Sequence, residues 1–221
     1  MANKKGTALS LVRADIPSDK EEEFNLWYNS EHIPELLALP GYLNAARYVA
    51  VRGGPQYLAC YELDNPEATN TEAAQRRRAN PTEWGKRIDP NVIGTNFSVN
   101  LYQQIFPAEV SPDVAQADMA PVLQIGCMDV PPEVEDEFNE WYNTIYVPNF
   151  EKVPGCIRGR RYRAVRGEPK YATVYEFEHE GVPQTPEWAA AREAHPQSAR
   201  MRSLMKLTPG SPAVYKKIFP L

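Results

Sequence analysis

His32 and Glu31 are adjacent titratable residues in a chain that has only three histidines. An imidazole titrates near neutral pH, so histidine is the side chain most often used as a general acid or base. Pro34 disfavours helical geometry at residue 33, and we therefore expect a helix to end or kink near His32. The dipole of a helix C-terminus would raise the imidazole pKa. These features predict that His32 is a catalytic acid/base; the structural alternative is a surface histidine that caps helix carbonyls.

The segment that contains His32 occurs twice. Phe24–Pro34 is repeated as Phe138–Pro148, and residues 8–62 align with residues 122–176 without a gap, with 23 of 55 positions identical. The copies differ at Glu31 and His32, where the second copy has isoleucine and tyrosine. A repeat of this length indicates two similar units. We predict a first unit over residues 1–107, a linker over 108–120 and a second unit over 121–221.

Periodicity within the first unit predicts the order strand, helix, strand, strand, helix, strand. A capping box at Ser18 and Glu21 favours a helix start there. The expected elements after it include a hairpin with Arg52–Pro55 as its turn, and the strands are expected at 7–14, 42–51, 56–63 and 97–106. We predict an α+β fold: two tandem ferredoxin-like βαββαβ units whose two sheets face each other as an intramolecular pseudo-dimeric α+β barrel, with the helices outside.

Further candidate site residues lie on the helix that carries His32. Trp27 and Tyr28 would form the apolar wall of a substrate pocket, although paired aromatics at helical spacing are more often core. Asn29 and Glu31 are candidate substrate-binding groups, and a local cap or turn interaction is the alternative for Asn29. Both halves keep the two aromatics and the asparagine, whereas only the first has Glu31.

Arg47 and Tyr48 are neighbours on one predicted strand, so their side chains point to opposite faces of the sheet. If Tyr48 faces the helices, it approaches His32 and serves as a second catalytic group. Arg47 would then point between the sheets, either as a substrate clamp or as a pair with an acidic residue such as Glu62 or Glu176.

The motifs of Trp27–Pro34, Pro40–Gly41 and Ala46–Tyr48 resemble those of the dimeric α+β barrel superfamily, and are closest to its EthD-like and uncharacterised branches. The resemblance covers both halves. It implies one of several chemistries, among them isomerisation, cofactor-independent quinol oxygenation, polyketide cyclisation and haem degradation. It also implies that the helix histidine, here His32, takes part in proton transfer. The second half has Tyr146 at that place.

We therefore expect a cofactor-independent enzyme that acts on a small aromatic or polyketide-like metabolite by proton-transfer isomerase, cyclase or lyase chemistry. The alternatives are a cofactor-free quinol-type monooxygenase and a non-catalytic ligand-binding or accessory protein of a catabolic pathway. Haem binding through His32 is a third possibility. We expect no cofactor and no metal, and the three cysteines are expected to be reduced core thiols.

Charge and hydropathy limit the expected partners. The net charge of −5 argues against binding to nucleic acid or to an anionic membrane surface. We expect a cytoplasmic protein with a small organic substrate and no membrane partner. A homodimer of the pseudo-dimeric chain is one assembly that the sequence allows. Five arginines between Arg158 and Arg166 could hold a carboxylate or phosphate, although paired surface charges or an oligomer contact explain them as well.

Overall fold

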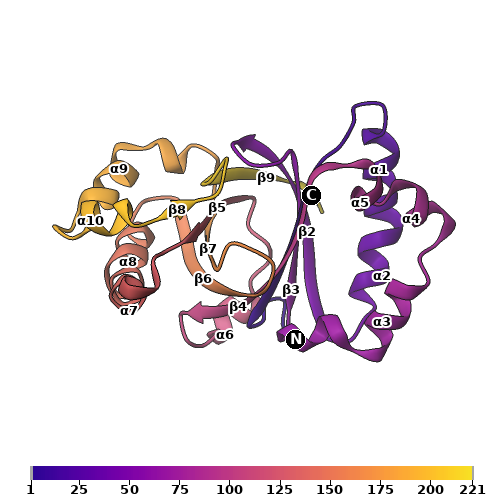
Figure 1. Ribbon diagram of the computed structural model, residues 1–221, viewed down its shortest axis with the longest axis horizontal. Helices are drawn as coiled ribbons and strands as arrows, with labels where there is room; N and C mark the ends of the chain where they lie inside the picture. Colours follow the sequence, from indigo (N-terminus) through magenta and orange to yellow (C-terminus); the bar gives the residue numbers. More distant parts are fainter. Residues whose placement is uncertain (1, 221) are drawn as a thin grey trace.

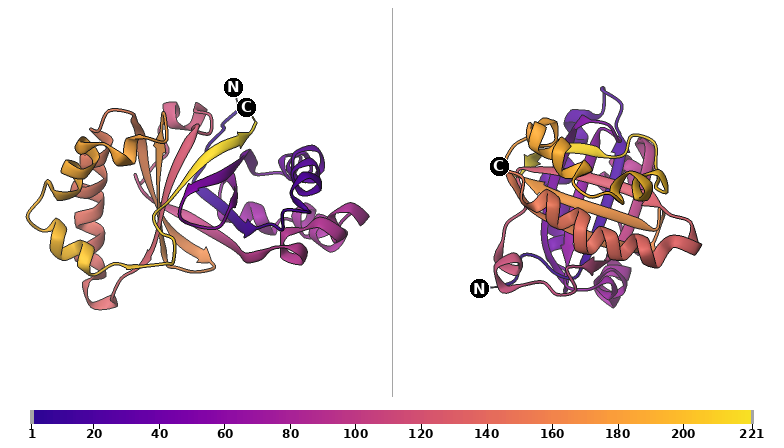
Figure 2. Two further views of the ribbon diagram at one scale, coloured as in Figure 1. Left: turned by 90° about the horizontal axis from the view of Figure 1, so that it is seen from above. Right: turned by 90° about the vertical axis from the view of Figure 1, so that its left-hand side faces the viewer.

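The computed structural model describes residues 2–220 and shows a central barrel with a group of helices on each side (Figures 1 and 2). The first helix group, α1–α5, and the second, α7–α10, lie at opposite ends of the long axis of the molecule. In the described part of the chain, no helix combines the length and the apolar character that crossing a membrane would require.

Nine strands are found within residues 2–220, and they belong to one antiparallel sheet in the order β7-β6-β4-β1-β3-β2-β9-β5-β8. A further pairing of β5 with β7 closes eight of them into a barrel, while β8 remains outside as a short extra strand. The strands are β1 (Ala8–Asp15), β2 (Tyr42–Arg52), β3 (Tyr57–Leu63), β4 (Thr95–Phe106), β5 (Val122–Asp129), β6 (Cys156–Arg166), β7 (Tyr171–Phe177), β8 (Lys206–Leu207) and β9 (Ala213–Phe219).

The expectation of two tandem ferredoxin-like units, each with its own four-stranded sheet, is wrong. Strands from the two halves are hydrogen-bonded to each other: β2 pairs with β9, and β4 pairs with β6. Two separate sheets would leave four edge strands with unpaired backbone groups, and closure into one barrel satisfies these groups. The structure is instead a closed eight-stranded antiparallel barrel with one extra strand, and helices lie outside the barrel.

Helices cover the outer face of the barrel on both sides. They are α1 (Glu21–Trp27), α2 (Ile33–Leu37), α3 (Glu72–Ala79), α4 (Glu83–Ile88), α5 (Pro90–Ile93), α6 (Pro112–Gln116), α7 (Glu135–Trp141), α8 (Val147–Glu151), α9 (Pro186–Glu193) and α10 (Ser198–Ser203). In α1 the expected capping box is absent: Lys20 is the N-cap residue and makes no side-chain cap. Thr71 and Thr185 do cap α3 and α9.

A π-helical segment over Tyr28–His32 connects α1 to α2, and Tyr142–Tyr146 connects α7 to α8 in the same way. The N–H of Ile33 donates to the carbonyl of Tyr28, five residues back. This wider turn accommodates Pro34, which has no N–H to donate. The helical segment therefore continues past His32, but the regular α-helix is interrupted over Tyr28–His32, so the expected end or kink near His32 takes the form of a π-helical turn.

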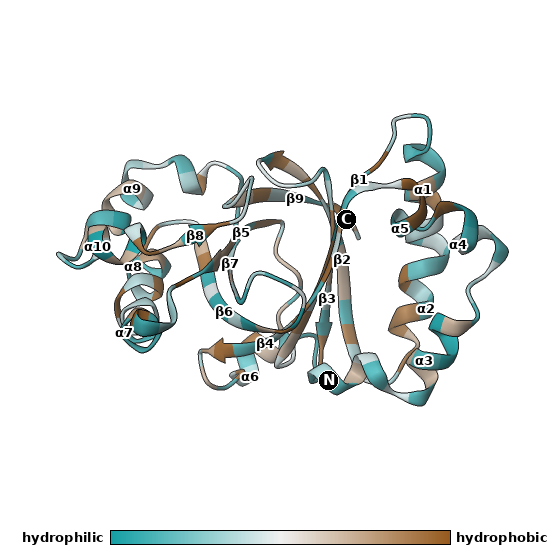
Figure 3. Ribbon diagram, viewed as in Figure 1, coloured by the Kyte–Doolittle hydropathy of each residue, from teal (hydrophilic) through white to brown (hydrophobic). Residues whose placement is uncertain are grey.

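Three apolar clusters hold the layers together. One fills the barrel with residues such as Leu11, Tyr48 and Ile125, and the other two lie between the barrel and each helix group. Hydrophobic and hydrophilic residues both occur along the strands (Figure 3), and in β6 the consecutive residues 159–162 are buried whereas the end of the strand at Arg166 is exposed. Filling of the barrel by side chains is typical of eight-stranded barrels.

Candidate functional site

His32 is buried in the middle of a continuous helical segment and is braced by Arg77 of α3. Only 9% of its surface is exposed, and Arg77 Nη2 lies 2.8 Å from His32 Nδ1. The same guanidinium donates to Glu35 at 2.9 Å from Nη2 and 3.1 Å from Nε. The contacts therefore tie α2 to α3 through a chain of Glu35, Arg77 and His32.

The environment of His32 favours its neutral form. Burial, followed by the nearby charges of Arg77 and Arg47, lowers the pKa of His32 to about 3. The prediction that a helix C-terminus raises this pKa is therefore wrong. Because a guanidinium only donates, Nδ1 must accept and Nε2 must carry the proton. In this arrangement His32 can donate a hydrogen bond through Nε2 but has no free basic nitrogen.

Glu31 has a bracing role of the same kind. Its Oε1 accepts from the indole Nε1 of Trp27 at 2.8 Å and from the hydroxyl of Thr82 at 2.5 Å. These bonds hold α1 against the start of α4. In the second half Ile145 takes the place of Glu31, and the indole nitrogen of Trp141 is buried without a partner in the described structure.

Arg47 is clamped by two asparagines on the outer side of the barrel. It donates to Asn29 Oδ1 at 2.8 Å and to Asn25 Oδ1 at 2.6 Å, and its guanidinium lies 4.6 Å from the ring centre of Tyr28. Arg161 repeats this arrangement with Asn139 and Asn143. The repeated clamp explains why both halves keep these residues. Asn29 and Tyr28 contact Arg47 in the core, where they stabilise the packing of the helix on the barrel.

Tyr48 does not meet His32. It is fully buried inside the barrel, where its hydroxyl donates to the carbonyl of Ala120 at 3.0 Å. Because Tyr48 faces the interior, its neighbour Arg47 faces the helices, the reverse of the orientation considered from the sequence. Trp27 and Tyr28 are almost fully buried and pack against His32, with ring centres 4.5 and 4.6 Å apart, respectively.

The arginine-rich strand β6 does not gather its charges into one anion site. Arg160 points into the barrel and binds Glu62 at 2.7 Å, whereas Arg161 points to the helices. Arg158 lies 3.3 Å from Glu176, and Lys5 lies 2.9 Å from the same carboxylate. Glu62 and Glu176 are thus paired inside the barrel, but with partners other than Arg47.

Two cavities occupy equivalent positions in the halves. The cavity beside His32 has a volume of about 140 Å³, and its counterpart beside Tyr146 has a volume of about 580 Å³. Residues that line the first include Ser10, Val12, His32, Leu36 and Tyr61, and the residues 114 positions later line the second: Gln124, Gly126, Tyr146, Phe150 and Tyr175. The sequence predicted a ligand site at His32. The ligand-sized cavity instead lies beside Tyr146, the residue of the second half that aligns with His32.

The larger cavity lies between the barrel and the helices α8, α9 and α10, and we call it the second-half cavity. Strands β5 and β7 form its floor, where Gly126 replaces the bulk of Val12. Aromatic rings form much of its wall, and they are those of Tyr142, Tyr146, Phe150, Tyr175 and Trp188. Phe150 and Trp188 pack with ring centres 4.0 Å apart, so two helices fix this wall.

Polar groups are few in this cavity and are clustered. Arg192 and Arg202 line it together with Gln124, and Arg202 donates to Glu193 Oε2 at 2.8 Å. The hydroxyl of Tyr175 is buried without a partner in the described structure, as is Nε of Arg202. Burial raises the pKa of Tyr146, and the charges of Arg202 and Arg192 partly oppose this rise. Tyr146 is therefore protonated at neutral pH.

Sequence reasoning missed this cavity because it treated the titratable pair in the first half as the functional difference. The replacement of Val12 by Gly126 at aligned positions was a usable signal, since it removes a side chain from a buried strand. The residues supplied by α9 and α10 lie beyond the gap-free alignment, which ends at residue 176. Their approach to Tyr146 follows from the tertiary fold alone.

Comparisons with known proteins support the fold. No family model and no curated protein matches the sequence. A solved structure of a candidate monooxygenase from Fusobacterium nucleatum is similar, with a TM-score of 0.60, 13% identity and coverage of 95% of this chain and 91% of that chain. An anthrone oxidase-like protein has a TM-score of 0.58, 17% identity and coverage of 98% and 93%. A haem-binding protein from Thermus thermophilus has a TM-score of 0.57, 10% identity and coverage of 97% and 92%.

These likenesses, all under 25% identity, show a shared fold, and membership of the dimeric α+β barrel superfamily stays a prediction. Placement in the EthD-like branch and descent of the two halves from one unit stay predictions.

The residues present do not fit a histidine-ligated haem. His32 adjoins a cavity of about 140 Å³, which is too small for a porphyrin, and its Nδ1 is already bonded to Arg77. Among the described residues, no histidine lines the larger cavity. The possibility of haem binding through His32 is therefore not supported by the geometry.

Proposed function

We propose that the chain binds an aromatic phenolic or enolic metabolite in the second-half cavity and oxygenates it with O₂ without a cofactor. The observation that carries this proposal is a cavity of about 580 Å³ that joins an aromatic wall to three guanidinium groups, those of Arg52, Arg192 and Arg202, against one carboxylate, that of Glu193. The names of similar structures, a candidate monooxygenase and an anthrone oxidase-like protein, support the same class of reaction.

The dimensions of the cavity favour a planar ligand of several rings. Ligand sites commonly span about 300–1,000 Å³, and the second-half cavity lies in this range whereas the cavity at His32 does not. Rings such as those of Trp188 and Phe150 can stack on an aromatic ligand. Met128 and Met205 supply flexible apolar contacts that adapt to its outline.

The charges of the cavity favour an anionic form of the ligand. Arg192 and Arg202 would stabilise a phenolate or enolate, and Gln124 can hold a second oxygen through its amide. A nearby positive charge lowers the pKa of a bound phenol or enol. The anion is electron-rich, and this is the form that reacts with O₂ without help from a redox cofactor.

The proposed reaction converts a ring CH₂ group that is activated by a neighbouring carbonyl. The substrate loses one proton to give the enolate, whose carbon reacts with O₂ to form a hydroperoxide. Loss of water then leaves a new carbonyl: one oxygen atom stays in the product and the other leaves as water. The CH₂ carbon supplies all four electrons that reduce O₂, so the step needs no additional reductant.

Proton-transfer chemistry at His32 is not favoured, because Nδ1 is occupied and Nε2 is protonated. Tyr48, the expected second catalytic group, lies inside the barrel. A non-catalytic ligand-binding protein is the alternative. It would bind the ligand in the same cavity but would not convert it to a product.

The test is oxygen consumption with an anthrone as probe substrate, measured against the spontaneous oxidation of the probe in buffer and with heat-denatured protein. We expect the native protein to accelerate O₂ uptake and to incorporate one atom of heavy-isotope oxygen into the new carbonyl. Binding of the probe without accelerated uptake would overturn the oxygenase proposal and leave a ligand-binding protein.

Arg202→Met and Arg200→Met provide a matched pair on α10. Arg202 lines the cavity, whereas Arg200 binds Glu137 on the outer surface. Loss of a group that stabilises a developing anion reduces turnover by about 10²-fold or more, so we expect that effect for Arg202→Met and none for Arg200→Met. Equal activities of the two variants would contradict the role given to Arg202.

A further inference from the structure

The barrel interior contains charged groups at two ends, and only one end is balanced. At the balanced end Lys5 and Arg160 meet the carboxylates of Glu62 and Glu176. At the other end Arg13 of β1 is buried, with 9% of its surface exposed. The groups that raise the pKa of Arg13 against the lowering effect of burial are Cys127, Tyr215 and Tyr102, none of which is a carboxylate.

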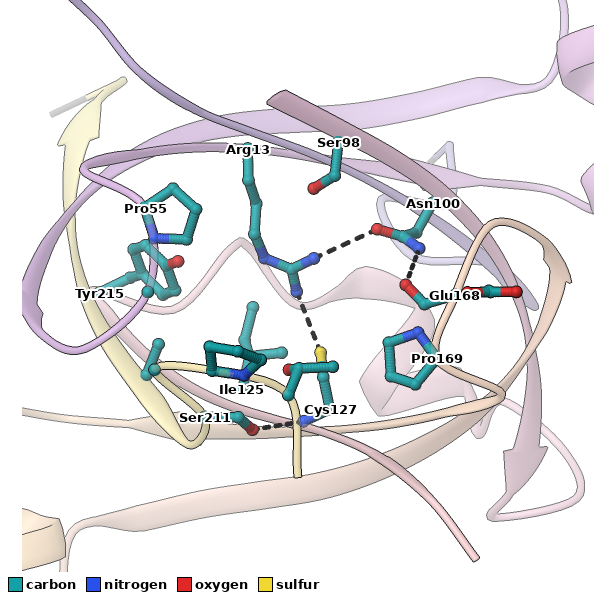
Figure 4. Close-up of a pocket in the computed structure, with 15 residues that line it drawn as sticks. Arg13, Pro55, Ser98, Asn100, Ile125, Cys127, Glu168, Pro169, Ser211 and Tyr215 are labelled. Carbon is teal, nitrogen blue, oxygen red and sulfur yellow. Dashed lines mark hydrogen bonds between the residues drawn. The ribbon is translucent and has the colours of Figure 1, made fainter. Parts of the chain in front are cut away.

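Arg13 makes its recorded hydrogen bonds to neutral polar groups. Its Nη1 donates to Asn100 Oδ1 at 3.3 Å and its Nη2 to Cys127 Sγ at 3.3 Å (Figure 4). Glu168 is the acidic residue that lines the same cavity, but its carboxylate points away from Arg13 and its backbone carbonyl accepts from Asn100 instead. A guanidinium has five N–H donors, so the recorded bonds leave donors free for a ligand.

Arg13 adjoins a cavity of about 170 Å³ at the end of the barrel. Tyr215 lines this cavity, and its hydroxyl is buried without a partner in the described structure. The hydroxyl of Tyr102, which lies close enough to Arg13 to affect its pKa, is also buried and unpaired. Unpaired buried hydroxyls are uncommon because each loses its bonds to water, and an acceptor in this cavity would satisfy the hydroxyl of Tyr215.

The other buried arginines on the strands are satisfied differently. Arg47 and Arg161 each donate to two asparagine oxygens and lie over tyrosine rings, while Nε of Arg161 is buried without a partner in the described structure. The space beside Arg47 is about 10 Å³, too small for a ligand. Arg13 thus differs in having both a shortage of acceptors and a cavity.

We propose that this cavity is a binding site for a small oxyanion, either a carboxylate of up to about benzoate size or inorganic phosphate. The ligand would receive N–H bonds from Arg13 and an O–H bond from Tyr215, both of which line the cavity. A carboxylate matches the planar fork of a guanidinium, which can donate to both oxygens. The size limit follows from comparison with an apolar cavity of about 150 Å³ that holds benzene.

Cys127 supplies a chemical readout inside the cavity, because its thiol contacts Arg13. We would alkylate the native protein with iodoacetate and, separately, with iodoacetamide, and follow each cysteine by peptide mass spectrometry. Cys156, which is partly exposed on β6 and outside this cavity, is the internal control. We expect the anionic reagent to be favoured at Cys127 over Cys156 by severalfold in the native protein, and this preference to be lost in Arg13→Gln.

Benzoate and inorganic phosphate are then added as competing ligands. At a concentration ten times its dissociation constant, a bound anion should slow alkylation of Cys127 about tenfold and leave Cys156 unchanged. Protection by benzoate alone identifies a carboxylate site, and protection by phosphate as well identifies a general oxyanion site. The proposal would be overturned if neither anion protected Cys127, or if the anions protected Cys127 equally well in Arg13→Gln.

Folding of the Arg13 variant is checked by circular dichroism. If Arg13→Gln does not fold, calorimetric titration of the native protein with benzoate and phosphate, repeated with Tyr215→Phe, replaces it. Measurable binding that is weaker in Tyr215→Phe supports the site, and no heat of binding for either anion contradicts it.

Discussion

Arg77 donates a hydrogen bond to Nδ1 of His32 at 2.8 Å, although the two residues are 45 positions apart in the sequence. The contact fixes the imidazole tautomer and connects helix α2 to helix α3. It turns the most promising acid/base candidate in the sequence into a structural brace. The equivalent residue in the second half, Tyr146, lies beside Arg202 and faces a cavity about four times larger.

The brace predicts a pH-dependent contribution to stability. The pKa of His32 is about 3 in the folded chain and about 6.5 in an unfolded one, so between these values the unfolded state binds more protons. The free energy of unfolding should therefore fall, as the pH falls from about 6.5 towards 3, by up to about 1.4 kcal/mol per pH unit from this residue. Above pH 6.5 the contribution is fully present.

Urea denaturation at several pH values measures this slope. We expect His32→Gln to have a shallower decline below pH 6.5 than the unmodified chain, whatever its stability at neutral pH. Identical slopes for His32→Gln and the unmodified chain would show that His32 is not held neutral.

Tyr48 is predicted to contribute to stability and not to turnover. Tyr48→Phe removes the hydroxyl that donates to Ala120 and leaves the carbonyl of that residue without this bond. The expected loss is about 1 kcal/mol of unfolding free energy, the usual net value of such a hydrogen bond. Oxygen uptake with the anthrone probe should not change; a tenfold decrease would return Tyr48 to the catalytic site.

The two arginine–asparagine clamps should be similarly sensitive to substitution. Lysine at position 47 or 161 cannot donate to both asparagine oxygens or stack on the tyrosine ring as a guanidinium does. We expect Arg47→Lys and Arg161→Lys each to lower the free energy of unfolding by roughly 2–4 kcal/mol, as for other buried charged networks. Arg163→Lys, at an exposed position of β6, is the control and should change it little. Large effects at only one of the two clamps would show that they are not equivalent.

Local sequence patterns predicted the strands well. The hairpin of β2 and β3, the alternation in β4 and the buried strand β1 all follow from short-range periodicity and turn residues. Closure of the barrel could not be predicted from these local patterns. It requires β2 to pair with β9 and β4 to pair with β6, and these edge strands come from different halves of the chain. Alternation gives two faces to a strand and does not say which face is inside.

That ambiguity explains the errors at the candidate site. Arg47 and Tyr48 were correctly expected on opposite faces, yet the face that each takes is set by the two asparagines that receive the guanidinium. The pKa of His32 depends on its burial and then on the charge of Arg77, and a sequence can show neither the burial nor the approach of Arg77. The second-half cavity depends on side chains from α9 and α10 that no motif connects to Tyr146.

The central claim is that ligand binding belongs to the second-half cavity, and paired cavity-filling variants test it most directly. Gly126→Val introduces the residue that the first half has at this place, and an added Cβ meets Met128 Cε at an ordinary contact distance of 3.4 Å. Val12→Ile fills the smaller cavity beside His32 as the matched control.

The measurement is titration of each variant with the anthrone probe, followed by quenching of tryptophan fluorescence, because Trp188 lines the cavity. We predict at least a tenfold weaker affinity for Gly126→Val, or about 1.4 kcal/mol, with an unchanged affinity for Val12→Ile. Unchanged affinity in Gly126→Val together with weakened affinity in Val12→Ile would contradict the account and return the site to His32.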